Sequence, residues 1–309
     1  MAENSAISWT RHTWNPWMGC TKLTPACDGC YAEALMDKRY GKVQWGNHPR
    51  VRTGKHTWND PVRWQRQAEK DGDRPFVFCA SLADIFDNQV DPQWRADAFE
   101  VMRKTPNLVY LLLTKRPQNI VKLADEAGGL PANAALGATC EDQPRADENL
   151  PALQVAKIEL QPLFTFGSFE PLIGEIVATP SWLPDWIIVG GETDQGGHKA
   201  RPTHPDWMRS LRDQAAAAGK PFHLKQWGEW APQLGSVDLP DNPEISRYQW
   251  AEWDGEEWEF WDRPMWCDEL DPEHSMIRAG KKHTGRMLDG VTHDAFPTVP
   301  AVKSIGGAA

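Results

Sequence analysis

Short runs of consecutive apolar residues recur through the middle of the chain, and polar segments separate them. Within a run, apolar and polar positions do not alternate, which is the pattern of strands buried on both faces of a sheet. We expect one more strand just before Cys20, ahead of these runs. The runs predict strands at Phe76–Ala80, Leu108–Leu113, Ala135–Thr139, Leu163–Phe166, Trp186–Val189 and Phe222–Leu224.

Segments with helical character lie between these runs. The predicted helices are Pro92–Lys104, Gln118–Glu126, Arg145–Leu153 and Asp206–Ala218. The last of them follows His204 and Pro205 and stops before Gly219, which are typical start and stop signals. Strand–helix–strand units of about 30 residues are typical of parallel sheets. The sequence therefore predicts an α/β fold, a full or partial (β/α) barrel.

Polar residues and glycines follow six successive predicted strands. In (β/α) barrels the chemistry takes place at the carboxyl ends of the strands, so these residues would form a ring around one mouth. The ring would contain Ser81, Asp84, Thr114, Lys115, Arg116, Thr139, Glu141, Ser168, Glu170, Gly190, Gly191, Glu192, Lys225 and Gln226.

Two adjacent cations in this ring, Lys115 and Arg116, follow the most apolar strand of the chain. Buried cations are costly unless they are paired. They would hold a carboxylate or phosphate of a ligand, or form salt bridges to Glu141 or Glu170 within the mouth.

The composition changes after Trp227, where Trp, Asp and Glu become frequent. Asp254-Gly255, between Trp253 and Trp258, predicts a tight β-hairpin. We interpret residues 1–227 as the barrel and residues 228–309 as a Trp-rich acidic extension packed on it. We expect its tail to be disordered from about residue 298.

The net charge of −10 argues against broad binding of nucleic acid, which depends on many phosphate contacts. It leaves room for a local basic groove, and the alternative for the same segment is a solvated loop. The candidate residues are Arg39, Lys42, His48, Arg50, Arg52, Lys55, His56 and Arg63, interleaved with Trp45 and Trp58. Without a visible secretory signal or a membrane-length apolar run, we expect a cytoplasmic protein.

Three cysteines, Cys20, Cys27 and Cys30, lie within eleven residues that also contain Gly and Pro. Such a loop can wrap a metal centre. A cubane iron–sulfur cluster normally has four Cys ligands, and three would leave one iron open, as in catalytic metal sites. The alternative is zinc, with a fourth ligand such as His12, Asp28 or a distant Cys. Cys79 and Cys140 lie in apolar runs, so we expect them to be buried core residues.

The cysteine loop resembles that of the radical S-adenosylmethionine (SAM) enzymes, although the spacing here is Cys-x6-Cys-x2-Cys and the usual spacing is Cys-x3-Cys-x2-Cys. A closer resemblance covers nearly the whole chain. It is to a radical-SAM-like, three-cysteine-motif family encoded by phages and prophages, distantly related to spore photoproduct lyase. The blocks that carry it are Trp14–Cys20, Cys27–Glu33, Leu113–Pro117, Phe169–Gly174, Ile188–Glu192, Arg201–Pro202, His204–Trp207, Lys225–Gly228 and Gly285–Gly290.

This resemblance implies that Cys20, Cys27 and Cys30 hold a [4Fe–4S] cluster and that SAM binds the open iron. It implies further roles by strand-end position. SAM would be bound by Tyr31, Ser81, Asp84, Gly190, Gly191 and Glu192, and the substrate or the SAM carboxylate by Lys115, Arg116, Glu170 and Lys225.

The function that follows is a phage-type radical SAM enzyme that modifies or repairs a nucleic acid or nucleotide. Its expected partners are a reductant such as flavodoxin or ferredoxin and a phage-encoded protein. Two alternatives stay open at this point: a zinc- or cluster-stabilised nucleic-acid-binding module without catalysis, and a subunit that delivers electrons to another enzyme.

Overall fold

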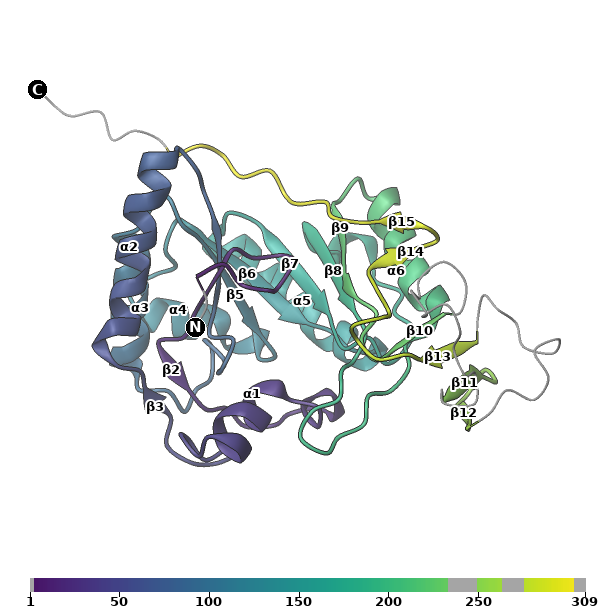
Figure 1. Ribbon diagram of the computed structural model, residues 1–309. Helices are drawn as coiled ribbons and strands as arrows, with labels where there is room; N and C mark the ends of the chain where they lie inside the picture. The colour runs from purple at the N-terminus through teal and green to yellow at the C-terminus, as the bar shows by residue number, and fades with distance from the viewer. Residues whose placement is uncertain (1–2, 233–248, 263–274, 303–309) are drawn as a thin grey trace, which may run out of the picture.

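The computed structural model describes residues 3–232, 249–262 and 275–302. Its main body is one curled sheet of seven parallel strands, in the order β1-β4-β5-β6-β7-β8-β9 (Figure 1). Neighbouring strands follow chain order, and β1 and β9 form the two edges, so the sheet is a partial (β/α) barrel, as predicted. The strands are β1 (His12–Trp14), β4 (Phe76–Cys79), β5 (Val109–Thr114), β6 (Ala134–Thr139), β7 (Thr165–Phe169), β8 (Trp186–Gly190) and β9 (Phe222–Gln226).

Both faces of the sheet are buried, which explains the continuous apolar runs. In β5, Tyr110 and Leu112 pack in an outer cluster towards the helices, whereas Val109 and Leu111 belong to an inner cluster. The inner cluster also contains Trp9, whose ring centroid lies 4.7 Å from that of Phe78. Large aromatic side chains thus fill the concave side of the sheet below its mouth.

The helices cover the outer face of the sheet (Figure 1). They are α2 (Lys55–Asp71), α3 (Pro92–Arg103), α4 (Ile120–Glu126), α5 (Gln143–Leu160) and α6 (Pro205–Ala217). Four of them were predicted, and α2 was not. Its buried positions include Pro61, Trp64 and Ala68, spaced as one face of a helix, and Gly72 ends it in the left-handed conformation.

The Trp-rich extension contains an antiparallel sheet in the order β10-β13-β11-β12. Trp253 pairs with Trp258 across the predicted Asp254-Gly255 turn, which confirms the hairpin. Trp207 of α6 packs against the partly buried Trp253 with ring centroids 5.2 Å apart, so aromatic side chains of the extension pack on α6. The strands are β10 (Trp230–Pro232), β11 (Trp250–Trp253), β12 (Trp258–Trp261) and β13 (Met276–Arg278).

A C-terminal segment, residues 293–300, covers the edge of β9. The backbone N–H of Leu224 donates to His293 O, and that of Ala295 donates to Phe222 O. The segment then passes the amino ends of the strands, on the side of the sheet opposite α1 (Tyr31–Glu33) (Figure 1). Cys267 lies outside the described residues. So do residues 303–309, which make up much of the predicted tail. Within the described ranges, no helix is long and apolar enough to cross a membrane.

Replacing Gly137 tests the packing inside the sheet. A Cβ at Gly137 would lie 2.3 Å from Phe166 Cζ, so Gly137→Ala forces the aromatic cluster apart. We expect a loss of ~1–3 kcal/mol in the free energy of unfolding, measured by urea denaturation. Gly54→Ser is the matched control, because a Cβ at Gly54 meets no atom within 4 Å. Equal midpoints for the two variants would contradict the packing described here.

Candidate functional site at the mouth of the sheet

A cavity of about 1140 Å³ opens at the carboxyl ends of the strands. Trp9 and Phe78 of the inner cluster form part of its floor. Its walls come from strand ends and from the chain around the cysteines. Among the predicted site residues, the cavity is lined by Cys27, Cys30, Tyr31, Lys115, Glu170, Gly191, Glu192 and Lys225.

The cysteine loop, residues 19–30, runs from β2 (Trp17–Met18) to α1 and lies over this mouth. All three of its cysteines are free thiols and half-buried. Cys27 and Cys30 line the cavity, whereas Cys20 packs beside it. Burial and the carboxylate of Asp84 raise the pKa of the Cys20 thiol to about 12, and burial also raises the pKa of Cys30.

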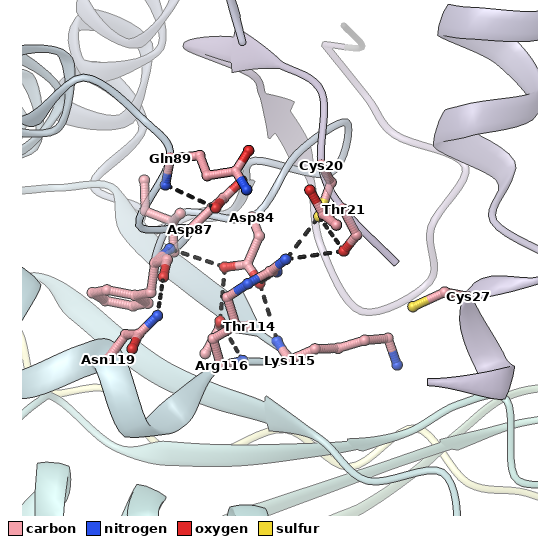
Figure 2. A network of polar contacts seen from close by, with 12 residues as sticks. Cys20, Thr21, Cys27, Asp84, Asp87, Gln89, Thr114, Lys115, Arg116 and Asn119 are labelled. Carbon is pink, nitrogen blue, oxygen red and sulfur yellow. Dashed lines mark hydrogen bonds and ion pairs between the residues drawn. The ribbon is translucent and has the colours of Figure 1, made fainter. Parts of the chain in front are cut away.

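Asp84 holds the ends of β4 and β5 together (Figure 2). It is 4% exposed, and its Oδ1 accepts hydrogen bonds from Thr114 Oγ1 at 2.7 Å and from the N–H of Phe86 at 2.9 Å. Its Oδ2 accepts from the N–H of Lys115 at 3.2 Å and from Arg116 Nη1 at 2.8 Å. This buried carboxylate therefore has four donors, all from its own strand end and the next.

Arg116 connects that carboxylate to the cysteine loop (Figure 2). Its Nη1 lies 3.5 Å from Cys20 Sγ, and its Nη2 donates to Thr21 O at 2.9 Å. A second buried guanidinium, that of Arg50, pairs with Asp87 at 2.6 Å and donates to Thr21 Oγ1 at 2.8 Å. The first turn of the loop is thus fixed by two arginines.

The opposite side of the loop rests on the end of β8. Glu192 is buried and accepts from Arg201 through both carboxylate oxygens, at 2.6 and 2.9 Å. Burial opposes its ionisation, but the hydrogen bonds from Arg201 hold the pKa of Glu192 below its usual value. Arg201 also donates to Pro25 O at 3.4 Å, and a Cβ at Gly29 would lie 3.0 Å from Glu192 Oε1. Glu192 therefore supports the loop through Arg201 and by direct packing.

Ion pairs form within the mouth, as one of the sequence alternatives predicted. Lys115 Nζ lies 3.3 Å from Glu141 Oε2, and Thr24 of the cysteine loop donates to the same carboxylate. On the other wall, Lys225 Nζ lies 2.5 Å from Glu170 Oε1. Both lysines still line the cavity, so their ammonium groups remain within reach of a ligand.

Packing within the protein explains the two glycines at the end of β8, Gly190 and Gly191. A Cβ at Gly191 would lie 1.9 Å from Trp227 O, and a Cβ at Gly190 would lie 3.0 Å from Glu170 Cδ. The backbone of Gly191 lines the cavity, whereas Gly190 does not. At Gly191 the lack of a side chain is therefore required by the close approach of the backbone at Trp227.

Tyr31, which lines the cavity, also contacts a predicted residue that does not line it. Tyr31 donates its hydroxyl to Ser81 O, so this pair links α1 to the end of β4. Ser81, Asp84, Arg116, Gly190 and Cys20 do not line the cavity. Sequence reasoning did not single out Arg50 or Arg201 as anchors of the loop, although Arg201-Pro202 stands in one of the motif blocks.

The thiols and their surroundings decide which kind of metal group could be bound here. Across residues 3–232, 249–262 and 275–302, no three His, Cys, Asp or Glu side chains form a group that could hold a metal ion. The suggested fourth ligands for zinc are engaged elsewhere: His12 stacks on Trp64, and Asp28 lies 3.8 Å from Lys22. Three free thiols on one loop beside a cavity do fit the chemistry of a thiolate-bound cluster with an open position.

Comparison with protein families decides where the chain belongs. The family model described as "Protein of unknown function (DUF5131)" matches residues 4–297. The chain belongs to this family. No curated protein matches it significantly.

Solved structures of spore photoproduct lyase variants are similar to the chain at low identity. One is 11% identical with a TM-score of 0.43, and the match covers 88% of this chain and 74% of that chain. Another is 10% identical with a TM-score of 0.44, and the match covers 84% and 70%.

Asp84→Asn tests whether the Asp84 carboxylate holds the ends of β4 and β5 together. The change leaves the Arg116 guanidinium buried without its carboxylate and turns an amide N–H₂ towards other donors. We expect a loss of ~3–5 kcal/mol in the free energy of unfolding, measured by urea denaturation. The control Asp125→Asn, at an exposed position, should change it by less than ~0.5 kcal/mol. An Asp84→Asn protein as stable as the native chain would show that this carboxylate does not hold the strand ends.

Glu192→Gln tests the second anchor through pH. A carboxylate whose pKa is lowered on folding stabilises the protein above its unfolded pKa of about 4.3, and that stabilisation disappears as pH falls through the folded value. The stability difference between the native chain and Glu192→Gln should therefore be largest at neutral pH and shrink below about pH 4. Thermal unfolding from pH 3 to 7 measures it, with the exposed Glu175→Gln as control. A difference that does not depend on pH would contradict the ion pair.

Proposed function

We propose that this chain is an iron–sulfur enzyme of the radical SAM type that modifies or repairs a nucleic acid or a nucleotide. The main support is the position of three free thiols on one loop, over the carboxyl end of a curled parallel sheet and beside a large cavity. In (β/α) barrels this end carries the chemistry.

Cys20, Cys27 and Cys30 would hold the cluster. A [4Fe–4S] cluster bound there together with SAM would supply one-electron cleavage of SAM and hydrogen abstraction from the substrate. The electron would come from a donor such as flavodoxin or ferredoxin.

Arg116 is a positioning residue in this proposal. Its guanidinium bonds to Asp84 and to the loop backbone, and it places a positive charge 3.5 Å from Cys20 Sγ. This cation offsets part of the rise in the pKa of Cys20 that burial and Asp84 cause, and the thiolate is the form that binds metals. Asp84 acts one step further away, because it fixes Arg116.

The cavity-lining residues would bind the organic ligands. Lys115 and Lys225 carry the ammonium groups suited to the carboxylate of SAM or an anionic part of the substrate. Tyr31 and the backbone of Gly191 stand on the cavity side, where adenine and ribose would lie. Glu170 and Glu192 offer carboxylate oxygens to amino or hydroxyl groups. The enclosing walls would keep water from the reacting atoms.

Anaerobic purification followed by iron, sulfide and zinc analysis tests this function. We expect about four irons per chain, as a cubane cluster requires. Cys27→Ala should lose most of the iron, whereas Cys79→Ala, which alters a buried core thiol, should keep it.

Addition of SAM and dithionite then tests the reaction. Release of 5′-deoxyadenosine by the native chain, and not by Cys27→Ala, supports an enzyme. Iron without that product favours the electron-delivering alternative. Stoichiometric zinc without sulfide would overturn the proposal in favour of a structural module.

A further inference from the structure

The cavity has a charge opposite to that of the whole protein. The chain carries a net charge of −10, yet seven lysine and arginine side chains line the cavity against two carboxylates. A concave site with walls of one sign concentrates ligands of the other sign. The cavity is therefore built for an anionic ligand.

Four of these seven cations already have carboxylate partners. Besides Lys115 and Lys225, Lys38 lies 3.4 Å from Glu33 Oε1, and Arg286 pairs with Asp294. Their charges are largely offset by protein groups. They are not the residues most available to a ligand.

The other three, Arg39, Lys281 and Lys282, form no ion pair with any carboxylate among the described residues. We call these three residues the cationic rim. Arg39 ends the short helix that follows the cysteine loop, and the two lysines follow β13 in the Trp-rich extension. Two segments far apart in the sequence thus bring unpaired positive charge to one cavity.

Lys281 of the rim lies near another cation that lines the cavity, Lys225. Burial and the neighbouring ammonium of Lys225 lower the pKa of Lys281. A bound anion would relieve this repulsion. Phosphate groups suit such a site, because lysine binds them as a point charge and arginine through two parallel hydrogen bonds.

The size of the cavity bears on what the rim holds. About 1140 Å³ exceeds the range of ~300–1,000 Å³ for sites that bind one small molecule. It has room for a cofactor and a nucleotide together. The ring of Tyr31 lines the cavity and is 41% exposed, so it offers a surface on which a base can stack.

We propose that Arg39, Lys281 and Lys282 bind the phosphodiester backbone of a single-stranded nucleic acid and so place one nucleotide in the cavity. This inference deepens the proposed function by identifying the substrate as a strand and the residues that hold it.

The rim differs from the basic groove that the sequence indicated. Of the arginines in that groove, Arg50 is buried against Asp87, Arg52 pairs with Asp97 at 2.7 Å, and Arg63 pairs with Glu3 and Asp60. Arg39 is the member of that groove that lines the cavity. The strand would therefore run past the extension and not along α2.

Binding of a fluorescein-labelled 12-nucleotide strand, followed by anisotropy over a range of salt concentrations, tests the rim. The proteins are the full chain purified anaerobically, the double variant Lys281→Gln/Lys282→Gln, and Arg39→Gln. Each lost phosphate contact should weaken binding and reduce the slope of log K against log salt by about 0.7. The control Lys104→Gln/Lys122→Gln removes two exposed charges on the helical face and should match the native chain. Native-like binding by both rim variants would overturn the proposal.

Two further measurements identify the kind of ligand and distinguish this inference from the proposed function. Tight binding of either a DNA or an RNA strand of the same sequence supports the proposal. A 5′-mononucleotide that binds as tightly as the 12-mer would overturn it, because the ligand would then not need to be a strand. Cys27→Ala should lose iron and still bind the strand, because the rim does not depend on the thiols. Failure of the rim proposal then appears as native-like affinity and an unchanged salt slope in the rim variants, whereas failure of the proposed function appears as absent iron or absent SAM cleavage.

Discussion

The guanidinium of Arg116, placed between the Asp84 carboxylate and the Cys20 sulfur, is the interaction on which the candidate site depends. The cysteine loop contains little regular structure of its own, so its shape must come from what it touches. Arg116 ties its first turn to β5, and Arg201 ties its middle to the end of β8. A loop fixed at both sides by a rigid sheet holds its thiols in a preorganised arrangement.

The charged groups at the strand ends divide into those that hold the cysteine loop and those that can reach a ligand. Groups that look like ligand contacts in the sequence, such as Asp84 and Glu192, are largely engaged in holding the loop. A buried charge needs a partner, and here the partner is supplied by the protein. The charge available to a ligand therefore lies at the cavity-lining cations that form no ion pair among the described residues, Arg39, Lys281 and Lys282.

The sequence predicted the sheet well because both of its faces are buried, which leaves continuous apolar runs such as that of β5. It missed α2, because Trp58 stands among the basic residues that indicated a nucleic-acid groove, and the helical spacing of the buried positions was overlooked. Ion pairing was harder to foresee. Asp84 and Arg116 are 32 residues apart, and Gly191 is confined by Trp227, which is equally remote along the chain. Such partners are set by the order of strands, which a single sequence does not show.

The boundary predicted at residues 227 and 228 marks a change in composition, but the cavity crosses it. A Cβ at Gly228 would lie 2.0 Å from Glu192 O, so the start of the extension packs directly on the end of β8. Trp230 donates to Ala200 O at 2.8 Å, which joins the extension to the segment that contains Arg201. The extension therefore supports the residues that hold the cysteine loop, and it also contributes three cations to the cavity, Lys281, Lys282 and Arg286. A partial barrel leaves one side of its sheet open. Here the described parts of residues 228–302 cover that side and add positive charge to the cavity. A further strand that closed the barrel would not provide that cover and charge.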